Sequence, residues 1–418
     1  MSKWKETDIG PIPADWDVIT VADAIQDKGI AVGVMYPGED TVGGIPMIRV
    51  ADIKGGKINS STGYHISPSV NEQHKRTILN GGEVIVTLVG NPGTTVVVRD
   101  EFKGWNVARA IGVMKLKDPS EGKYLSYALH SPNSKFLIDS FLNTTVQPTL
   151  NLGELKLVQI PWPNKSIRIS IAEALSSIDD KIDLLHRNNK TLEQLAETLF
   201  RQWFEKVENE ESTTIKNIEE VATVQNGYSF KSSEFITEQP DTLEVLKMGH
   251  ISAEGGLRPS PKKDFIKRDE KYNKWILNKR DIILAMTDMK DNVVILGVPA
   301  LIDQDNKYVL NQRVGRISIN DGSLIENILI LYMQMKDKNF ISELQSKGNS
   351  GVQVNLGTDT IRQTKVVVPS KDNQRKILPQ LESIFDKLDH NRNQVQQLEI
   401  LRDTLLPKLM SGIVRVEN

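Results

Sequence analysis

The densest group of side chains that could do chemistry lies in residues 258–280. Nine basic residues stand there against three acidic ones, in a chain whose formal net charge is −2. Tyr272 and Trp275 are interspersed among them. Such a patch suits contacts to nucleic-acid phosphates, which give affinity but carry no sequence information. A solvated loop face is the alternative interpretation. The basic residues are Arg258, Lys262, Lys263, Lys267, Arg268, Lys271, Lys274, Lys279 and Arg280.

Polar turn segments that recur in both halves of the chain are candidates for reading base edges. Residues 143–147 and 349–353 correspond at an offset of 206 positions, and Arg109 corresponds to Arg313 at an offset of 204. Residues 225–232 form a third polar segment. Arg, Lys, Asn and Gln on rigid loops can distinguish base pairs, although each segment could equally be a structural turn. The predicted DNA-binding residues are Arg109, Gln147, Tyr228, Lys231, Lys262, Lys263, Arg313 and Gln353.

Motifs for catalysis are missing from the sequence. It has no phosphate-binding loop, no HExxH, no GxSxG and no Asn/Asp-Pro-Pro-aromatic motif of an amino-methyltransferase. The six histidines are scattered, and there is no cysteine. Asp241, Glu244 and Lys247 have the wrong spacing for a nuclease site. We therefore predict no catalytic residue, no metal site and no cofactor, which favours a binding or scaffold protein. A nuclease or methyltransferase acting alone is the alternative.

The composition places few other limits on function. The chain has 418 residues, enough for several domains, and 39% of them are hydrophobic. The small net charge means that any nucleic-acid surface must be local. No apolar run approaches the roughly 18 residues of a membrane span, and the N-terminus lacks a secretory h-region. We expect a cytoplasmic protein with no membrane contact.

A helical stripe of apolar residues occurs twice, 206 positions apart. Its steps of three and four residues are the seam spacing of a coiled coil. The length of each stripe predicts a long helix. The first of them is expected to begin at, or a few residues before, the capping box of Ser170 and Glu173. Asn189 and Asn391 lie at or beside the seam. The first stripe is Ile171, Leu175, Ile178, Ile182, Leu192, Leu195, Leu199 and Trp203, and the second is Ile377, Leu381, Ile384, Leu388, Leu398, Leu401, Leu405 and Leu409.

The repeat predicts an α+β protein with two similar mixed α/β globules. The expected division is a first globule over 1–165, a central helix over 166–208, a second globule over 209–370, and a distal helix with tail over 371–418. Strands are expected at 84–88 and 94–98, and amphipathic helices at 124–142 and 326–345. We expect the long helices to pair antiparallel and relate the globules by a pseudo-two-fold. The alternative is that each helix packs only on its own globule.

Several segments resemble the specificity subunits of type I restriction-modification systems. Residues 5–16 are similar to the usual start of that family, and residues 226–232 to the start of its target recognition domains. Residues 199–204 and 405–412 resemble the ends of its central and distal helices. The match follows the family's order over essentially the whole chain. It departs at Gly29-Ile30-Ala31-Val32-Gly33, where the second globule has Gly227-Tyr228-Ser229-Phe230.

The resemblance implies a non-catalytic DNA-recognition subunit. Each globule would read one half of a bipartite, asymmetric site, and the helices would set the spacing. Two adenine-N6 methyltransferase subunits would dock on the helices and carry S-adenosylmethionine, and restriction (motor) subunits would join them. We expect Trp203, Phe204 and Leu409 to lie on the docking surface. A coiled-coil adaptor that binds only proteins is the remaining alternative.

Overall fold

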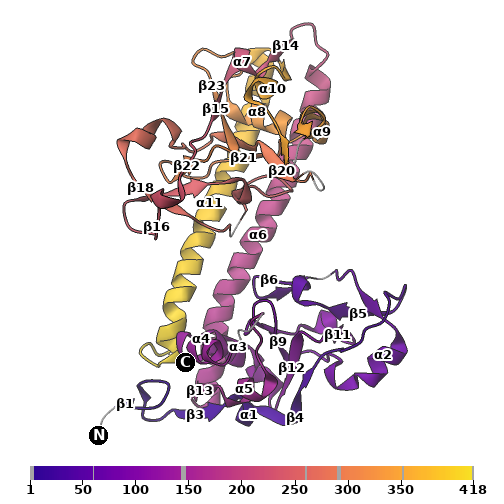
Figure 1. The fold of residues 1–418 in the computed structure, drawn as a ribbon, viewed down its shortest axis with the longest axis vertical. Coiled ribbons are helices and arrows are strands. Elements are labelled where there is room, and N and C mark those ends of the chain that lie inside the picture. The colour runs from indigo at the N-terminus through magenta and orange to yellow at the C-terminus, as the bar shows by residue number, and fades with distance from the viewer. Residues whose placement is uncertain are drawn as a thin grey trace. The chain divides into compact units, whose positions relative to one another are not determined.

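The computed structural model describes residues 4–59, 61–142, 147–258, 261–289, 293–350 and 353–416. The chain divides into two compact units. Unit 1 comprises Met1–Leu185 with Gln394–Asn418, and unit 2 comprises His186–Asn393. Each unit holds one mixed α/β globule and parts of two long helices (Figure 1). The predicted fold class is confirmed.

A four-stranded antiparallel sheet forms the centre of unit 1. Its strands lie in the order β10-β9-β12-β4. Every residue of β9 is buried, as expected for a β-branched run covered on both faces. The strands predicted at 84–88 and 94–98 are present as β9 and β10. The bounds are β4 (Ile25–Val32), β9 (Val84–Thr87), β10 (Thr95–Val97) and β12 (Ile111–Leu116).

Smaller sheets complete unit 1. β5 pairs parallel to β11 and antiparallel to β8. β13 pairs antiparallel with β3 just before the first long helix. Two hairpins, β1–β2 and β6–β7, complete the set. The bounds are β1 (Trp4–Lys5), β2 (Ile12–Pro13), β3 (Asp17–Thr20), β5 (Ile45–Ile48), β6 (Ile53–Lys54), β7 (Lys57–Ile58), β8 (His65–Ile66), β11 (Asn106–Val107) and β13 (Gln159–Trp162).

Unit 2 repeats this topology. Its central sheet has the order β21-β19-β23-β15, β17 pairs parallel to β22 and antiparallel to β18, and β26 pairs with β14 as β13 does with β3. The bounds are β14 (Thr214–Asn217), β15 (Ala222–Asn226), β16 (Phe235–Ile236), β17 (Thr242–Leu246), β18 (Phe265–Lys267), β19 (Ile282–Ala285), β21 (Pro299–Leu301), β22 (Tyr308–Leu310), β23 (Val314–Ile319) and β26 (Lys365–Val368).

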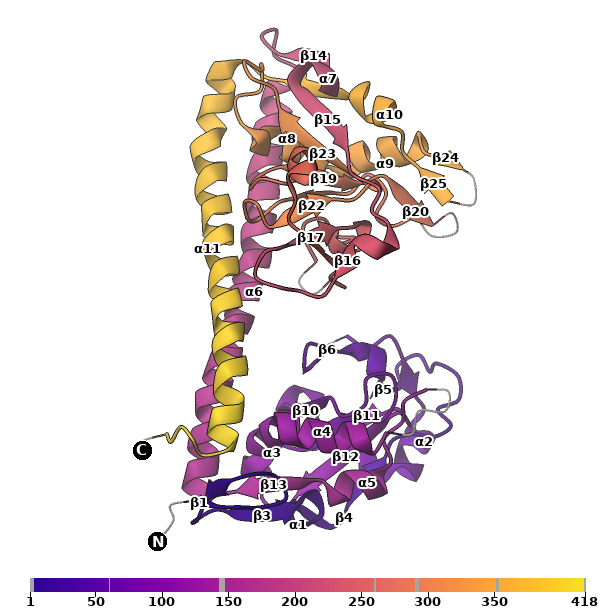
Figure 2. The same ribbon diagram turned by 60° about the vertical axis from the view of Figure 1, so that its left-hand side comes forward.

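A further sheet in unit 2 has the order β20-β25-β24. Figure 2 shows it at the rim of the unit. Its strands are β20 (Thr287–Met289), β24 (Asn349–Ser350) and β25 (Gln353–Asn355).

The single helices predicted at 124–142 and 326–345 are wrong, because each is two helices. Ser131 separates α3 (Gly122–His130) from α4 (Pro132–Ser140), and a residue before proline disfavours the helical conformation. Lys336 and Asp337 separate α8 (Ile328–Met335) from α9 (Lys338–Ser346), and the Asp337 carboxylate accepts a hydrogen bond from the Asn339 amide at 2.8 Å.

Short helices and 3₁₀ turns connect the strands. The helices are α1 (Val21–Ala24), α2 (Pro68–Gln73), α5 (Leu152–Leu157), α7 (Ile218–Val221) and α10 (Thr358–Arg362). The 3₁₀ turns are η1 (Val50–Asp52), η2 (Lys75–Thr77), η3 (Asp100–Phe102), η4 (Pro119–Glu121), η5 (Ser232–Glu234), η6 (Met248–His250) and η7 (Glu270–Trp275).

The two long helices are α6 (Lys165–Val207) and α11 (Lys371–Met410). Asn164 caps α6, because its side-chain oxygen accepts the amide hydrogen of Ile167 at 3.0 Å. The helix thus begins a few residues before Ser170, as expected. Within the described residues, no helix has both the length and the apolar character needed to cross a membrane.

The long helices pack antiparallel within each unit. In unit 1, Arg402 of α11 pairs with Asp179 of α6 at 3.1 Å, and Val395 packs with Ile182. In unit 2, Asn391 donates to Asn189 at 2.8 Å, and both amides are buried, as the seam prediction implies. The alternative in which each helix packs only on its own globule is wrong.

One position of the apolar stripe faces away from the seam. Leu195 and Leu401 correspond at an offset of 206, and each is 45% exposed. The stripe therefore has one solvent-facing member in each unit.

Candidate nucleic-acid interface

Several chain segments meet at one end of the central sheet in unit 1. Thr87, the last residue of β9, lies opposite Ile111, the first residue of β12. Val32, the last residue of β4, lies opposite Gly112. The segments that follow β4 and β9 therefore emerge beside the segment that precedes β12. We call residues 33–36, 88–94, 108–110 and 147–150 the loop end of unit 1.

Backbone hydrogen bonds hold this loop end together. The Val34 amide donates to the Val107 carbonyl at 2.7 Å, and the Leu88 amide donates to the Ala110 carbonyl at 2.8 Å. The Leu150 amide donates to the Leu88 carbonyl at 2.9 Å. Arg109 and Gln147 are both exposed. Two residues predicted from the sequence are thus brought to the same end of one sheet.

Unit 2 forms an equivalent loop end from residues 227–230, 286–289, 311–313 and 353–356. The Tyr228 amide donates to the Leu310 carbonyl at 2.8 Å, and the Met286 amide donates to the Arg313 carbonyl at 3.0 Å. The Leu356 amide donates to the Met286 carbonyl at 2.8 Å. Arg313 and Gln353 are exposed.

These hydrogen bonds correct the predicted correspondence between Arg109 and Arg313. Leu88 bonds to Ala110 as Met286 bonds to Arg313, so Ala110 is the counterpart of Arg313. Arg109 corresponds instead to Gln312. The correspondence of Gln147 with Gln353 is consistent with the structure, because each lies three residues before the leucine that closes its loop end.

The start of the second target segment also has a different counterpart from the expected one. A Cβ atom on Gly33 would lie 2.2 Å from the Val107 carbonyl oxygen, and one on Gly227 would lie 2.2 Å from the Asn311 carbonyl oxygen. Only glycine permits this approach of two backbones. The counterpart of Gly227 is therefore Gly33, and not the segment that begins at Gly29.

Tyr228 lies in an aromatic cluster. Its ring centroid is 4.9 Å from those of Phe230 and Trp275 and 5.4 Å from that of Tyr272. The Trp275 indole donates to the Asn226 carbonyl at 3.1 Å. This packing indicates a structural role for Tyr228, whereas the sequence left open whether the residue is structural or contacts DNA. Lys231, which follows the cluster, is exposed.

Lys262 and Lys263 are exposed just before β18. β18 runs antiparallel to β17, whose end lies beside the end of β22 in a parallel pair. The lysines therefore approach the side of the sheet from which residues 311–313 emerge. This position keeps them among the candidate phosphate contacts.

Much of the positive charge in residues 258–280 already has partners. Arg280 pairs with Asp386 at 2.9 Å, and Lys279 pairs with Asp389 at 2.9 Å, both on α11. Asp183, the counterpart of Asp389 on α6, pairs with Lys57 of β7 in unit 1. Lys279 and Arg280 therefore fasten their globule to a long helix.

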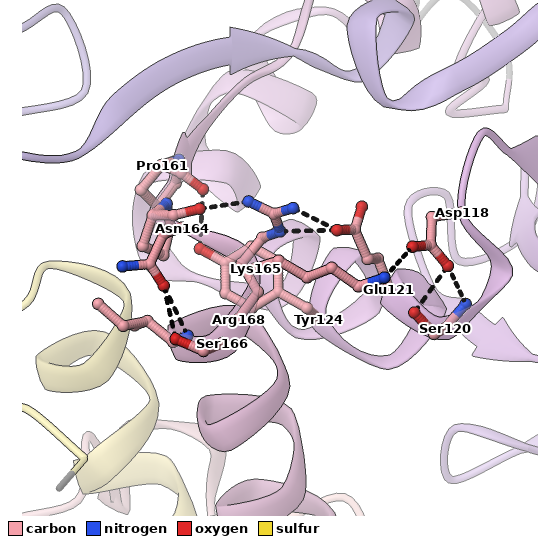
Figure 3. A network of polar contacts seen from close by, with 11 residues as sticks. Asp118, Ser120, Glu121, Tyr124, Pro161, Asn164, Lys165, Ser166 and Arg168 are labelled. Carbon is pink, nitrogen blue, oxygen red and sulfur yellow. Dashed lines mark hydrogen bonds and ion pairs between the residues drawn. The ribbon is translucent and has the colours of Figure 1, made fainter. Parts of the chain in front are cut away.

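A buried ion pair joins α6 to the unit 1 globule (Figure 3). The Arg168 guanidinium bonds to the Glu121 carboxylate and to the Pro163 carbonyl, and it lies 4.1 Å from the Trp162 ring centroid. Nearby, Lys165 pairs with Asp118 at 2.5 Å. The hydrogen bond from Lys165, with others from Ser120, lowers the pKa of Asp118 to about 2.

In unit 2 the corresponding contact between a long helix and the globule is made by an uncharged side chain. Gln374, the counterpart of Arg168, is fully buried, and its amide donates to the Pro369 and Leu324 carbonyls at 2.8 Å. Its side-chain oxygen accepts the Glu326 amide at 2.8 Å.

The residues expected to dock partners are more buried than predicted. Leu409 is only 3% exposed in the core of unit 1, so it offers little surface for docking, contrary to the prediction. Trp203 and Phe204 are half-buried against the core of unit 2. Among the residues of the two apolar stripes, Leu195 and Leu401 are the most exposed.

The described residues contain no cluster of His, Asp or Glu that could hold a metal ion. The side chains of Glu244 and Lys247 pair with different groups: Glu244 lies 3.0 Å from His250, and Lys247 pairs with Asp264 at 2.7 Å. Burial alone would raise the pKa of Glu244, but the hydrogen bond from His250 and nearby lysine charges lower it. Residues 143–146 and 351–352 of the predicted base-reading segments lie outside the described residues.

Comparison with known proteins identifies the family. The type I restriction modification DNA specificity domain matches residues 34–194 and again residues 210–399. The MjaIX specificity subunit of Methanocaldococcus jannaschii is 24% identical over 100% of this chain and 98% of its own length. The MjaVIII specificity subunit of that organism is 24% identical over 97% of this chain and 95% of its own length.

A solved structure shares the fold. The crystal structure of the S subunit of a type I restriction-modification system from M. genitalium has a TM-score of 0.53 and 17% identity, covering 94% of this chain and 96% of that one. Since the family's domain occurs twice and spans most of the sequence, the chain belongs to the specificity subunits of type I restriction-modification systems.

Proposed function

We propose that this chain reads a bipartite DNA sequence and carries no catalytic residue of its own. The observation that carries the proposal is the repeated loop end, where exposed Arg and Gln side chains stand on backbone-bonded turns in both units. Arg can bond bidentately to guanine, and Gln to adenine, in the major groove. Each unit would therefore read one half-site.

The two half-sites should differ in sequence. Gln147 and Gln353 are the same residue at corresponding positions, but Arg109 corresponds to Gln312 and Ala110 to Arg313. Different donors and acceptors at equivalent places select different base pairs. This supports an asymmetric site.

Two methyltransferase subunits would dock on the long helices. Leu195 and Leu401 support this proposal because they are equally exposed at corresponding positions, one in each unit. Two equivalent apolar positions suit two copies of one partner. The methyltransferase would supply S-adenosylmethionine and flip the target adenine out of the stack. Restriction subunits would join this complex.

The long helices would set the spacing between half-sites. With 43 residues in α6 and 40 in α11, they are roughly 60 Å long, and half-sites on one face of DNA are about 34 Å apart or a multiple of that. Inserting one matched turn into both helices should lengthen the unread gap and leave both half-site sequences unchanged. Mapping the methylated sequence of that variant checks this, and altered half-sites would contradict the spacer role.

The test of the proposed function is a genome-wide map of N6-methyladenine. Cells would express the methyltransferase partner with and without this chain. A bipartite motif that requires the chain is expected. A stable complex with the methyltransferase that adds no motif would indicate a protein-binding adaptor. DNA cleavage or methylation by the purified chain alone would contradict the absence of catalysis.

A further inference from the structure

An exposed aromatic side chain stands at the loop end of unit 1. Tyr36 is 81% exposed, and its neighbour Met35 is also exposed, as is Val42 in the same loop. In unit 2 the corresponding residue, counted from the paired glycines, is Phe230, which packs in the aromatic cluster. The two units thus treat the same position differently. A large apolar group that is exposed at one place and half-buried in an aromatic cluster at its equivalent suggests a contact made with a partner.

The loop that carries Tyr36 is fastened on both sides. Before it, Gly33 and Val34 donate to the carbonyls of Ile111 and Val107 at 3.0 and 2.7 Å. After it, the Tyr64 hydroxyl donates to the Gly38 carbonyl, and the His65 amide donates to the Asp40 carboxylate at 2.7 Å. These bonds reduce the ordering cost of a contact made through Tyr36.

The segment that carries Tyr36 begins beside the segment that carries Arg109, a predicted DNA-binding residue of unit 1. Val34 and Ala108 form a parallel bridge, so the two chains run on in the same direction. Tyr36 comes two residues after Val34, and Arg109 comes one residue after Ala108. Both side chains therefore belong to the same end of the sheet.

We propose that the ring of Tyr36 contacts the C5 methyl group of a thymine in the half-site read by unit 1. The inference rests on the proposed function. The thymine methyl is the apolar group that base edges present in the major groove. Tyr36 and Met35 supply apolar surface, and Arg109 supplies a cation for guanine or phosphate. Tyr36 is thus a specificity-determining residue at one T·A base pair.

The test uses the full complex of this chain with its methyltransferase subunits. Initial methylation rates are measured on duplexes in which each base pair of the recognised site is changed in turn. A second series replaces each thymine by uracil, which lacks only the methyl group. Tyr36→Ala is compared with Tyr36→Phe, which keeps the ring. Leu157→Ala is the matched control, because Leu157 is an exposed apolar residue of unit 1 at the far end of α5.

Tyr36→Ala should lower discrimination at one T·A pair by roughly 5- to 100-fold. Uracil at that position should slow the wild-type complex and leave the Tyr36→Ala complex unaffected, while Tyr36→Phe and Leu157→Ala behave as wild type. The proposal is overturned if Tyr36→Ala keeps full discrimination, or if uracil affects both complexes equally at every thymine. A wild-type complex that methylates no specific sequence would instead overturn the proposed function.

Discussion

Replacing Arg168 by alanine should destabilise unit 1 by about 3–5 kcal/mol, because it leaves the Glu121 carboxylate buried without its partner. Arg168 and Glu121 are both buried, and Arg168 also bonds to the Pro163 carbonyl and lies over Trp162. Hydrogen exchange on the full chain measures this change. The opening free energy of amides in β9 and β12 should fall, while that of β19 and β23 in unit 2 stays the same.

Two further variants separate the ion pair from general damage to the joint. Arg168→Met combined with Glu121→Leu removes both charges and should be less destabilising than Arg168→Ala, because a buried pair can be replaced by apolar groups at little cost. Lys165→Ala breaks the exposed contact with Asp118, and it should lower the opening free energies of the unit 1 amides much less than Arg168→Ala does. Equal losses of opening free energy in Arg168→Ala and Lys165→Ala would show that the buried ion pair stabilises unit 1 no more than the exposed one does.

Replacing Leu195 or Leu401 by glutamate should remove one methyltransferase subunit from the complex, and replacing both should remove two. A carboxylate buried without a partner in an apolar interface costs several kcal/mol, so binding at that position should weaken by about 100-fold or more. Native mass spectrometry counts the bound subunits directly. The expected series is two copies for the wild type, one for each single variant and none for the double variant.

The control for this series is Lys190→Glu, an exposed substitution toward another face of α6. It should keep both subunits. If Leu195→Glu and Leu401→Glu also keep both subunits, docking on these two positions is wrong, and the half-buried Trp203 and Phe204 become the next surface to test.

Short-range patterns predicted much of the fold. The β-branched runs at 84–88 and 94–98 predicted β9 and β10, and the two apolar stripes predicted the long helices α6 and α11. These patterns were sufficient because strand and helix periodicity depend on neighbouring residues. The breaks at Ser131 and Asp337 were missed, although Pro132 marks the first of them. The match of Arg109 with Arg313 was displaced by one residue, because a weak repeat with gaps does not determine register, whereas the bonds of Leu88 and Met286 do.

The candidate site was predicted only in part. Residue type drew attention to Arg109, and recurrence to Gln147 and Gln353. All three are exposed, and their role in binding stays a prediction. Tyr36 was missed because nothing local distinguishes an exposed tyrosine from a buried one. The aromatic packing of Tyr228 was equally invisible, since Tyr272 and Trp275 come from a segment more than 40 positions away.

The sequence by itself determined that the chain is duplicated, that each half ends in a long helix with an apolar seam, and that it lacks known catalytic motifs. These are properties of composition and short-range spacing. Only the tertiary structure decided which charged side chains form ion pairs and which apolar side chains remain exposed. Lys279 and Arg280 find their carboxylates on α11, more than 100 positions away, and Leu409 is buried in a core formed largely by the first part of the chain. Charge and burial depend on such distant partners, so they follow from the folded chain and not from local sequence.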